Sequence, residues 1–96
     1  MTADGAITHL LYLHGFRSSP QSFKARAVAG WLARHRPEIQ WWCPQLPPSP
    51  RESLELVYAE LARWPTEHMG VIGSSLGGFY ATLVAERTGC RAVLLN

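Results

Sequence analysis

The chain has 96 residues, of which 47% are hydrophobic and 17% charged, and its formal net charge is +2. This length accommodates one small domain, residues 1–96, and the composition is that of a globular protein, not of a disordered one. The low net charge, with basic residues scattered along the sequence, argues against nucleic-acid and membrane partners.

The N-terminus has no basic segment followed by a long apolar run, so we expect neither a signal peptide nor a membrane span. The two cysteines, Cys43 and Cys90, lack the spacing of a metal site or of a disulfide framework. We therefore expect reduced thiols and a cytoplasmic location.

Residues 7–13 are predicted to form the first strand, because a Leu-Leu-Tyr-Leu run is apolar on both faces, as in a central parallel strand. A loop that begins at His14 follows. Ser19 is a suitable helix N-cap with Pro20 at the first helical position, and the predicted helix ends near Pro37. Its expected apolar face consists of Phe23, Ala27, Val28, Trp31 and Leu32.

The second strand is predicted over residues 39–43, and a proline-rich segment, residues 44–50, ends it. A Pro-x-x-Pro spacing also occurs in segments that dock on aromatic grooves, but a connection stiffened by proline is the favoured interpretation. Ser49 and Glu52 form a capping box with Pro50 at the first helical position. The helix that follows is expected to stop before Pro65 and to bury Leu54, Val57, Tyr58 and Leu61.

The third strand, residues 69–72, leads into the segment Gly-Ser-Ser-Leu-Gly, residues 73–77, and a helix that ends at Gly89. The expected apolar face of this helix consists of Leu76, Phe79, Tyr80, Leu83 and Val84. Residues 92–95 form the fourth predicted strand. The order βαβαβαβ predicts the α/β class, with a parallel sheet and helices on both of its faces.

A strand, a Gly-x-Ser-x-Gly segment and a helix form the arrangement that a nucleophile elbow needs. The serine lies on a tight, strained turn, so the residues two positions away must be small, as Gly73 and Gly77 are. Centring the motif on Ser74 would put an isoleucine where a glycine is needed. Ser75 is therefore the candidate nucleophile, and the Leu76 N–H, at the helix N-terminus, is a candidate oxyanion donor. The alternative is a Gly/Ser-rich turn without chemistry.

Ligands of open parallel sheets bind beyond the carboxyl ends of the strands, where the loops 14–19, 43–49 and 73–77 are expected to meet. Gly15 allows the chain to turn directly after the first strand. The Phe16 N–H then becomes the second candidate oxyanion donor, beside that of Leu76. Two independent motifs thus predict an acyl-transfer site at this edge.

The sequence is similar to the YqiA/YcfP-type bacterial esterases, which have the α/β-hydrolase fold, in residues 10–16, 18–20, 44–48 and 71–78. The resemblance extends over nearly the whole chain, from Thr8 to Asn96. It implies that Ser75 is the nucleophile, that the Phe16 and Leu76 amides form the oxyanion hole, and that short-chain acyl esters are the substrates. It also implies that there is no metal or organic cofactor, and that the strands stand side by side as second, first, third and fourth.

In this fold the catalytic Asp or Glu and then the His follow the serine in the chain, and both are expected beyond residue 96. His14 is the nearest candidate base in the sequence, but its place in the His-Gly-Phe segment favours shaping of the loop. The other ionisable candidates are expected to lie away from Ser75 or, in the case of Cys43, to fill space: His9, His35, His68, Asp4, Glu86 and Cys43.

Three functions are compatible with these observations. The chain is the N-terminal half of a serine esterase, or a non-catalytic hydrolase half that binds a partner chain or an acyl ligand, or a thioesterase or acyltransferase that uses the same Ser75. The 96 residues alone are expected to be inactive. The edge strand from Ala92 to Leu95, apolar on both faces, is expected to mediate self-association.

Overall fold

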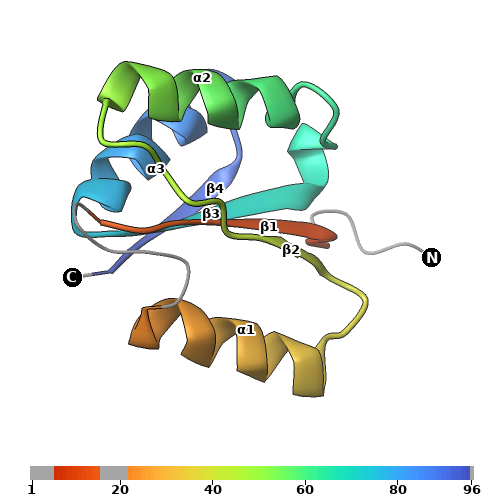
Figure 1. The fold of residues 1–96 in the computed structure, drawn as a ribbon. Helices are drawn as coiled ribbons and strands as arrows, with labels where there is room; N and C mark the ends of the chain where they lie inside the picture. Colours follow the sequence, from red (N-terminus) through yellow and green to blue (C-terminus); the bar gives the residue numbers. More distant parts are fainter. Residues whose placement is uncertain (1–5, 16–21, 96) are drawn as a thin grey trace.

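The computed structural model describes residues 6–15 and 22–95. Its four strands are β1 (His9–Leu13), β2 (Gln40–Trp42), β3 (Met69–Ser74) and β4 (Arg91–Leu95). They form one sheet in the order β2-β1-β3-β4, and every neighbouring pair is parallel (Figure 1). The predicted α/β class and strand order are therefore confirmed.

The helices cover both faces of this sheet. Helix α1 (Phe23–His35) lies on one face, and helices α2 (Pro50–Leu61) and α3 (Leu76–Thr88) lie on the other (Figure 1). A short 3₁₀ helix, η1 (Thr66–His68), precedes β3. In the described part of the chain, no helix has the length and apolar character needed to span a bilayer.

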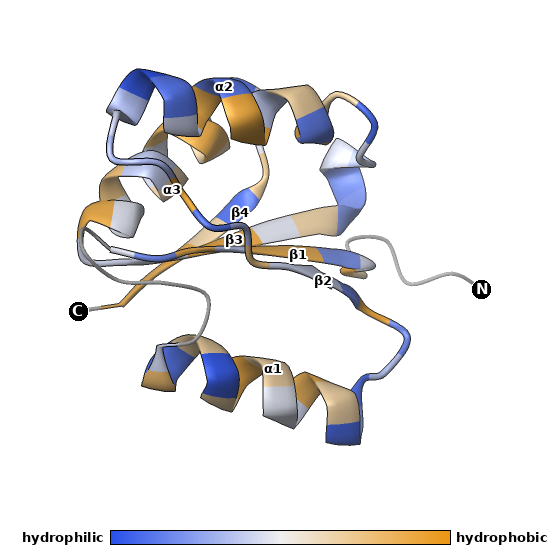
Figure 2. Cartoon of the chain, viewed as in Figure 1, coloured by the Kyte–Doolittle hydropathy of each residue, from blue (hydrophilic) through white to orange (hydrophobic). Residues whose placement is uncertain are grey.

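The main hydrophobic core lies between the sheet and the pair α2 and α3. Because side chains alternate along a strand, Leu11 and Leu13 point into this core, and Tyr12 between them points to the α1 side, against Trp41. In Figure 2 the apolar colouring appears on parts of β1, β3, β4 and α3, whereas β2 is pale. The remaining buried members of the core come from the loop after β2, from the two helices and from β3: Leu46, Val57, Leu61, Met69, Val71, Tyr80, Ala81 and Val84.

Helix α1 differs from the prediction in its start and in its buried face. It begins at Phe23, and the Ser22 hydroxyl caps it by accepting from the Ala25 N–H at 3.3 Å. The predicted cap, Ser19-Pro20, lies outside the described residues. Leu32 is buried as expected, but Phe23 and Trp31 are 85% and 51% exposed.

The reason for this correction is the position of Ala25, which is almost completely buried. Two residues along a helix correspond to a rotation of roughly 200°, so a helix that turns Ala25 and Leu32 inward turns Phe23 outward. Ala25 and Leu32 therefore define the buried side of α1, and the sequence pattern alone did not reveal that orientation.

Helix α2 has the predicted cap and apolar face. The Ser49 hydroxyl accepts from the Glu52 N–H at 3.3 Å, and Pro50 is the first helical residue. Val57 and Leu61 are buried, and Leu54 and Tyr58 pack against the core.

Helix α3 ends at Gly89 as predicted, with φ of 78° at that glycine. Its buried face is rotated from the predicted one, because Gly77 and Ala81 face inward with Tyr80 and Val84, whereas Leu76 and Phe79 are exposed.

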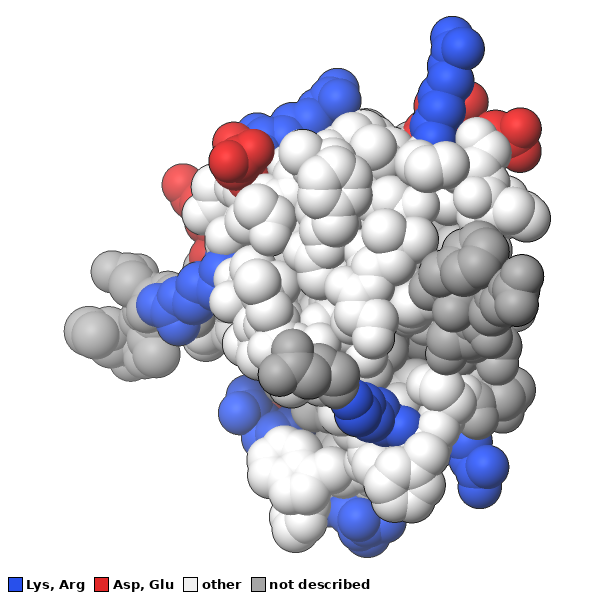
Figure 3. All heavy atoms as spheres, turned by 90° about the vertical axis from the view of Figure 1, so that its left-hand side faces the viewer, with Lys and Arg blue, Asp and Glu red and all other residues white. Residues whose placement is uncertain are grey.

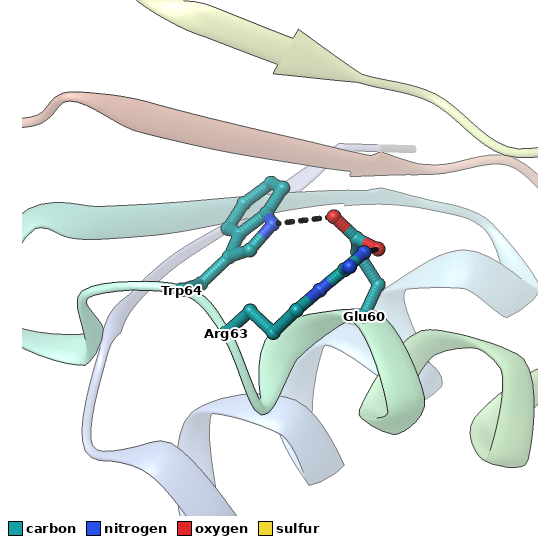
Figure 4. Close-up of polar contacts among 3 residues, drawn as sticks. All are labelled: Glu60, Arg63 and Trp64. Atoms are coloured by element: carbon teal, nitrogen blue, oxygen red, sulfur yellow. Dashed lines mark hydrogen bonds and ion pairs between the residues drawn. The ribbon is translucent and has the colours of Figure 1, made fainter.

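Trp64 connects the end of α2 to the amino-terminal edge of the sheet. Its indole N–H donates to Glu60 at 3.2 Å, and Arg63 also pairs with this carboxylate (Figure 4). The ring packs against His9 of β1 and Trp42 of β2, with centroid separations of 4.9 and 5.9 Å. The hydrogen bond from Arg63, followed by that from Trp64, lowers the pKa of the Glu60 carboxyl.

Candidate active site

Ser75 occupies the tight turn between β3 and α3. Its backbone angles are φ 54° and ψ −120°, and it is the one non-glycine residue with positive φ among residues 6–15 and 22–95. Such a conformation costs an L-amino acid about 1–3 kcal/mol and persists only where the surrounding structure enforces it. The turn is fixed on both sides, since the Ser75 N–H donates to the Leu95 carbonyl and the Ser75 carbonyl accepts from the Gly78 N–H.

The two glycines of the motif make this turn sterically possible. A Cβ atom at Gly73 would lie 2.7 Å from Gly78 Cα. One at Gly77 would lie 2.6 Å from the carbonyl carbon of Leu13. Both neighbours are backbone atoms and cannot rotate away, so any side chain at either position would force the strand and the helix apart.

Gly15, in the loop after β1, lies directly against Ser75. A Cβ atom at Gly15 would be 2.9 Å from Ser75 Cβ and 3.6 Å from Ser75 Oγ. The structure thus brings together the two segments that carry the sequence motifs. Phe16, the candidate second oxyanion donor, lies outside the described residues.

His14 is 4% exposed, and both nitrogens of its ring have partners. The Leu46 N–H donates to Nε2 at 2.9 Å, so Nε2 carries no hydrogen. The ring hydrogen is therefore on Nδ1, which lies 3.0 Å from the Gly15 carbonyl oxygen and donates to it. With both nitrogens engaged by the backbone, His14 is not free to take a proton from Ser75.

The other histidines lie away from the turn. His9 is the first residue of β1 and His68 immediately precedes β3, so both are at the amino-terminal edge of the sheet. Ser75 follows the carboxyl end of β3, at the opposite edge. His35 ends α1 and its ring packs against Trp31, at a centroid separation of 4.6 Å.

The remaining candidates are equally remote or unsuited. Glu86 is exposed on α3, about three turns beyond Ser75, and Asp4 lies outside the described residues. Cys43 directly follows β2, and burial raises the pKa of its thiol to about 11. A thiol with that pKa is almost entirely protonated at neutral pH, which disfavours Cys43 as a rival nucleophile.

Ser53 is a polar residue that the sequence analysis did not single out. It lies on the first turn of α2, is 1% exposed, and donates from its hydroxyl to the Pro47 carbonyl at 2.9 Å. The one sequence feature that could have indicated a buried, hydrogen-bonded Ser53 is its position four residues after a helix N-cap, on the buried side of that helix. Among the described residues, no group of three or more His, Cys, Asp or Glu side chains is arranged to hold a metal ion.

Residues 9–96 match the pattern of the family described as "Uncharacterised protein family (UPF0227)". This family is that of the YqiA/YcfP esterases, so at the level of the family it indicates an esterase-like hydrolase. The match leaves out only the first eight residues, and it confirms the resemblance inferred from the sequence motifs. The chain belongs to the UPF0227 family of YqiA/YcfP-type esterases.

Proposed function

We propose that the protein is a serine esterase that hydrolyses short-chain acyl esters with Ser75 as the nucleophile. The observation that carries this proposal is the strained backbone of Ser75 on the turn between β3 and α3. A glycine would adopt these angles at no steric cost, so a serine here needs a reason beyond the turn itself.

The surroundings of Ser75 support the same chemistry. Ser75 is exposed, so a substrate can reach it. The Leu76 N–H lies in the first turn of α3, where backbone donors have no intrahelical acceptor, and we propose it as one oxyanion donor. The Phe16 N–H is proposed as the second donor, on the position of Gly15 after β1 in the sequence and on the family resemblance. Figure 3 shows this face of the molecule, where the described atoms at and above the centre are uncharged and Lys or Arg side chains lie below it.

In the proposed reaction, Ser75 Oγ forms a bond to the ester carbonyl carbon while a base accepts the hydroxyl proton. The tetrahedral intermediate then breaks the bond to the alcohol, which leaves with a proton from the same group, and water hydrolyses the acyl-serine. None of the histidines in the described part of the chain is placed to be that base. The chain order typical of this fold puts the acid and the base after the elbow.

The proposal is tested in the full-length gene product that contains residues 1–96, with p-nitrophenyl acetate as the substrate. We expect Ser75→Ala to lower kcat by a factor on the order of 10⁶, as loss of a triad nucleophile does. Ser74→Ala, which removes the neighbouring hydroxyl, is the matched control and should leave kcat within a few-fold of the wild type. Retention of more than a few per cent of activity by Ser75→Ala would refute the assignment.

A further inference from the structure

The Pro-Gln-Leu-Pro-Pro segment, residues 44–48, contacts the candidate site through its backbone. The Leu46 N–H donates to His14 Nε2, and the Pro47 carbonyl accepts from the Ser53 hydroxyl. Leu46 itself is buried in the main core. The segment is therefore held at three points, by α2, by the core and by the His14 ring.

The same hydrogen bonds continue to Ser75. Because Nε2 of His14 accepts, Nδ1 is the donor and fixes the Gly15 carbonyl at 3.0 Å. A peptide group is planar, so a bond that fixes this carbonyl also fixes the plane of the peptide group that leaves Gly15. Gly15 in turn lies against Ser75, where an added Cβ would be 2.9 Å from the serine Cβ.

We propose that Ser53 and His14 are positioning residues that act through the segment 44–48 to hold Gly15 against Ser75. The inference rests on the proposed esterase function and extends it to residues that do not touch the substrate. Ser53 fixes the segment, the segment fixes the tautomer and orientation of His14, and His14 fixes the Gly15 peptide group. We call these three hydrogen bonds, Ser53 to Pro47, Leu46 to His14 and His14 to Gly15, the relay. Each of them involves a side chain that is at least nine-tenths buried, so water does not replace a lost partner easily.

The first test measures the relay without reference to activity. In wild-type protein, ¹⁵N NMR should show a His14 ring with its hydrogen on Nδ1 and an unprotonated Nε2. Ser53→Ala should shift the ring toward a mixture of tautomers and speed hydrogen exchange of the Leu46 amide about ten-fold. Thr82→Val is the matched control, because it removes a hydroxyl that donates to the Gly78 carbonyl outside the relay, and it should change neither signal. A wild-type ring protonated on Nε2, or no change in Ser53→Ala, would overturn the proposal.

The second test uses two variants that each keep one half of the imidazole. In the full-length protein, His14→Asn retains a donor near the Nδ1 position, and His14→Gln retains an acceptor near the Nε2 position. We expect Asn to keep kcat within about ten-fold of the wild type. Gln should lower it about 10²-fold, because a small misplacement of a reacting group is costly, with KM unchanged in both variants.

The comparison separates positioning from simple stabilisation. If His14 only stabilises the fold, the two variants would be less stable than the wild type but would have equal kcat below their melting temperatures, which would refute the positioning role. If the wild-type protein hydrolyses no ester, the proposed function fails, and the NMR measurements still decide whether the relay exists.

Discussion

At the scale of single residues, close approaches within the molecule decide where a side chain can be accommodated. Gly73, Gly77 and Gly15 are all positions where a methyl group would collide with backbone atoms or with Ser75. Gly15 differs from the other two because its nearest neighbour is the Ser75 side chain, not the framework of strand and helix. A substitution there should therefore affect the site more than the fold.

We predict that Gly15→Ala lowers kcat for p-nitrophenyl acetate about 10²-fold in the full-length protein, because the new methyl group displaces Ser75. Gly30→Ala is the matched control, since its Cβ would meet no atom closer than 3.6 Å. In the interior of α1 it should raise stability by roughly 0.5–1 kcal/mol and leave kcat unchanged. Steady-state kinetics with thermal unfolding distinguish these effects, and equal kcat in both variants would refute this prediction.

At the scale of elements, α2 is fastened at both of its ends. Its first turn holds the segment 44–48 through Ser53, and its last turn holds Trp64 through Glu60. The first attachment belongs to the edge of the sheet that carries Ser75, and the second to the opposite edge. Changes at Glu60 should therefore alter stability without altering turnover.

The pH dependence of that second attachment follows from the lowered pKa of Glu60. A carboxyl whose pKa is lower in the folded than in the unfolded state stabilises the fold at neutral pH. This contribution is present above the pKa that the carboxyl has in the unfolded state, about 4. It is lost as the pH falls from there through the lower pKa of the folded state. We predict that wild type exceeds Glu60→Gln in Tm by no more than a few degrees at pH 7, because the Glu60 side chain is 33% exposed and that of its partner Arg63 is 75% exposed.

This difference should shrink as the pH falls below about 4 and vanish once the pH is below the lowered pKa of Glu60, where both side chains are neutral. Glu67→Gln, which replaces an exposed carboxylate on η1, is the control for the loss of one negative charge. A gap between wild type and Glu60→Gln that stays constant from neutral to acidic pH would contradict the prediction.

At the scale of the whole molecule, the two edge strands of the described sheet, β2 and β4, differ in how exposed their residues are. Strand β4 is an edge strand, and its residues from Arg91 to Leu94 are exposed, including Val93 and Leu94 at more than half of their surface. The strand begins one residue before the predicted start and so includes Arg91. Antiparallel pairing of two copies about Val93 would set Arg91 opposite Leu95, and the two arginines would lie at opposite ends of the contact.

We therefore predict that a polypeptide of residues 1–96 self-associates through β4, since an apolar edge strand offers unpaired backbone groups to a second copy. Sedimentation velocity should show a mass that rises with concentration in the micromolar range. Leu94→Lys should abolish the rise, because it places a charge in the contact. Leu56→Lys, at an exposed leucine on α2, is the matched control and should not. A concentration-independent monomer in the unsubstituted polypeptide would refute this prediction.

Much of this architecture was determined by the sequence itself. The apolar runs at β1 and β3, the cap at Ser49 and the glycine at position 89 are local signals, and local backbone preferences were enough to predict the elements that they bound. The strand order and the family came from motifs that the chain carries intact, and both are confirmed.

Tertiary structure decided what depends on contacts between distant segments. The inward face of α1 was set by the burial of Ala25 together with Leu32, and the rotation of α3 by the fit of Gly77 against Leu13. The tautomer of His14 was set by a backbone N–H that lies 32 residues away in the sequence. Ser53 acquires its partner only when the segment 44–48 folds over α2. Periodicity reports which residues are apolar, but a hydrogen bond or a close approach depends on the coordinates of both partners, and those exist only once the chain has packed.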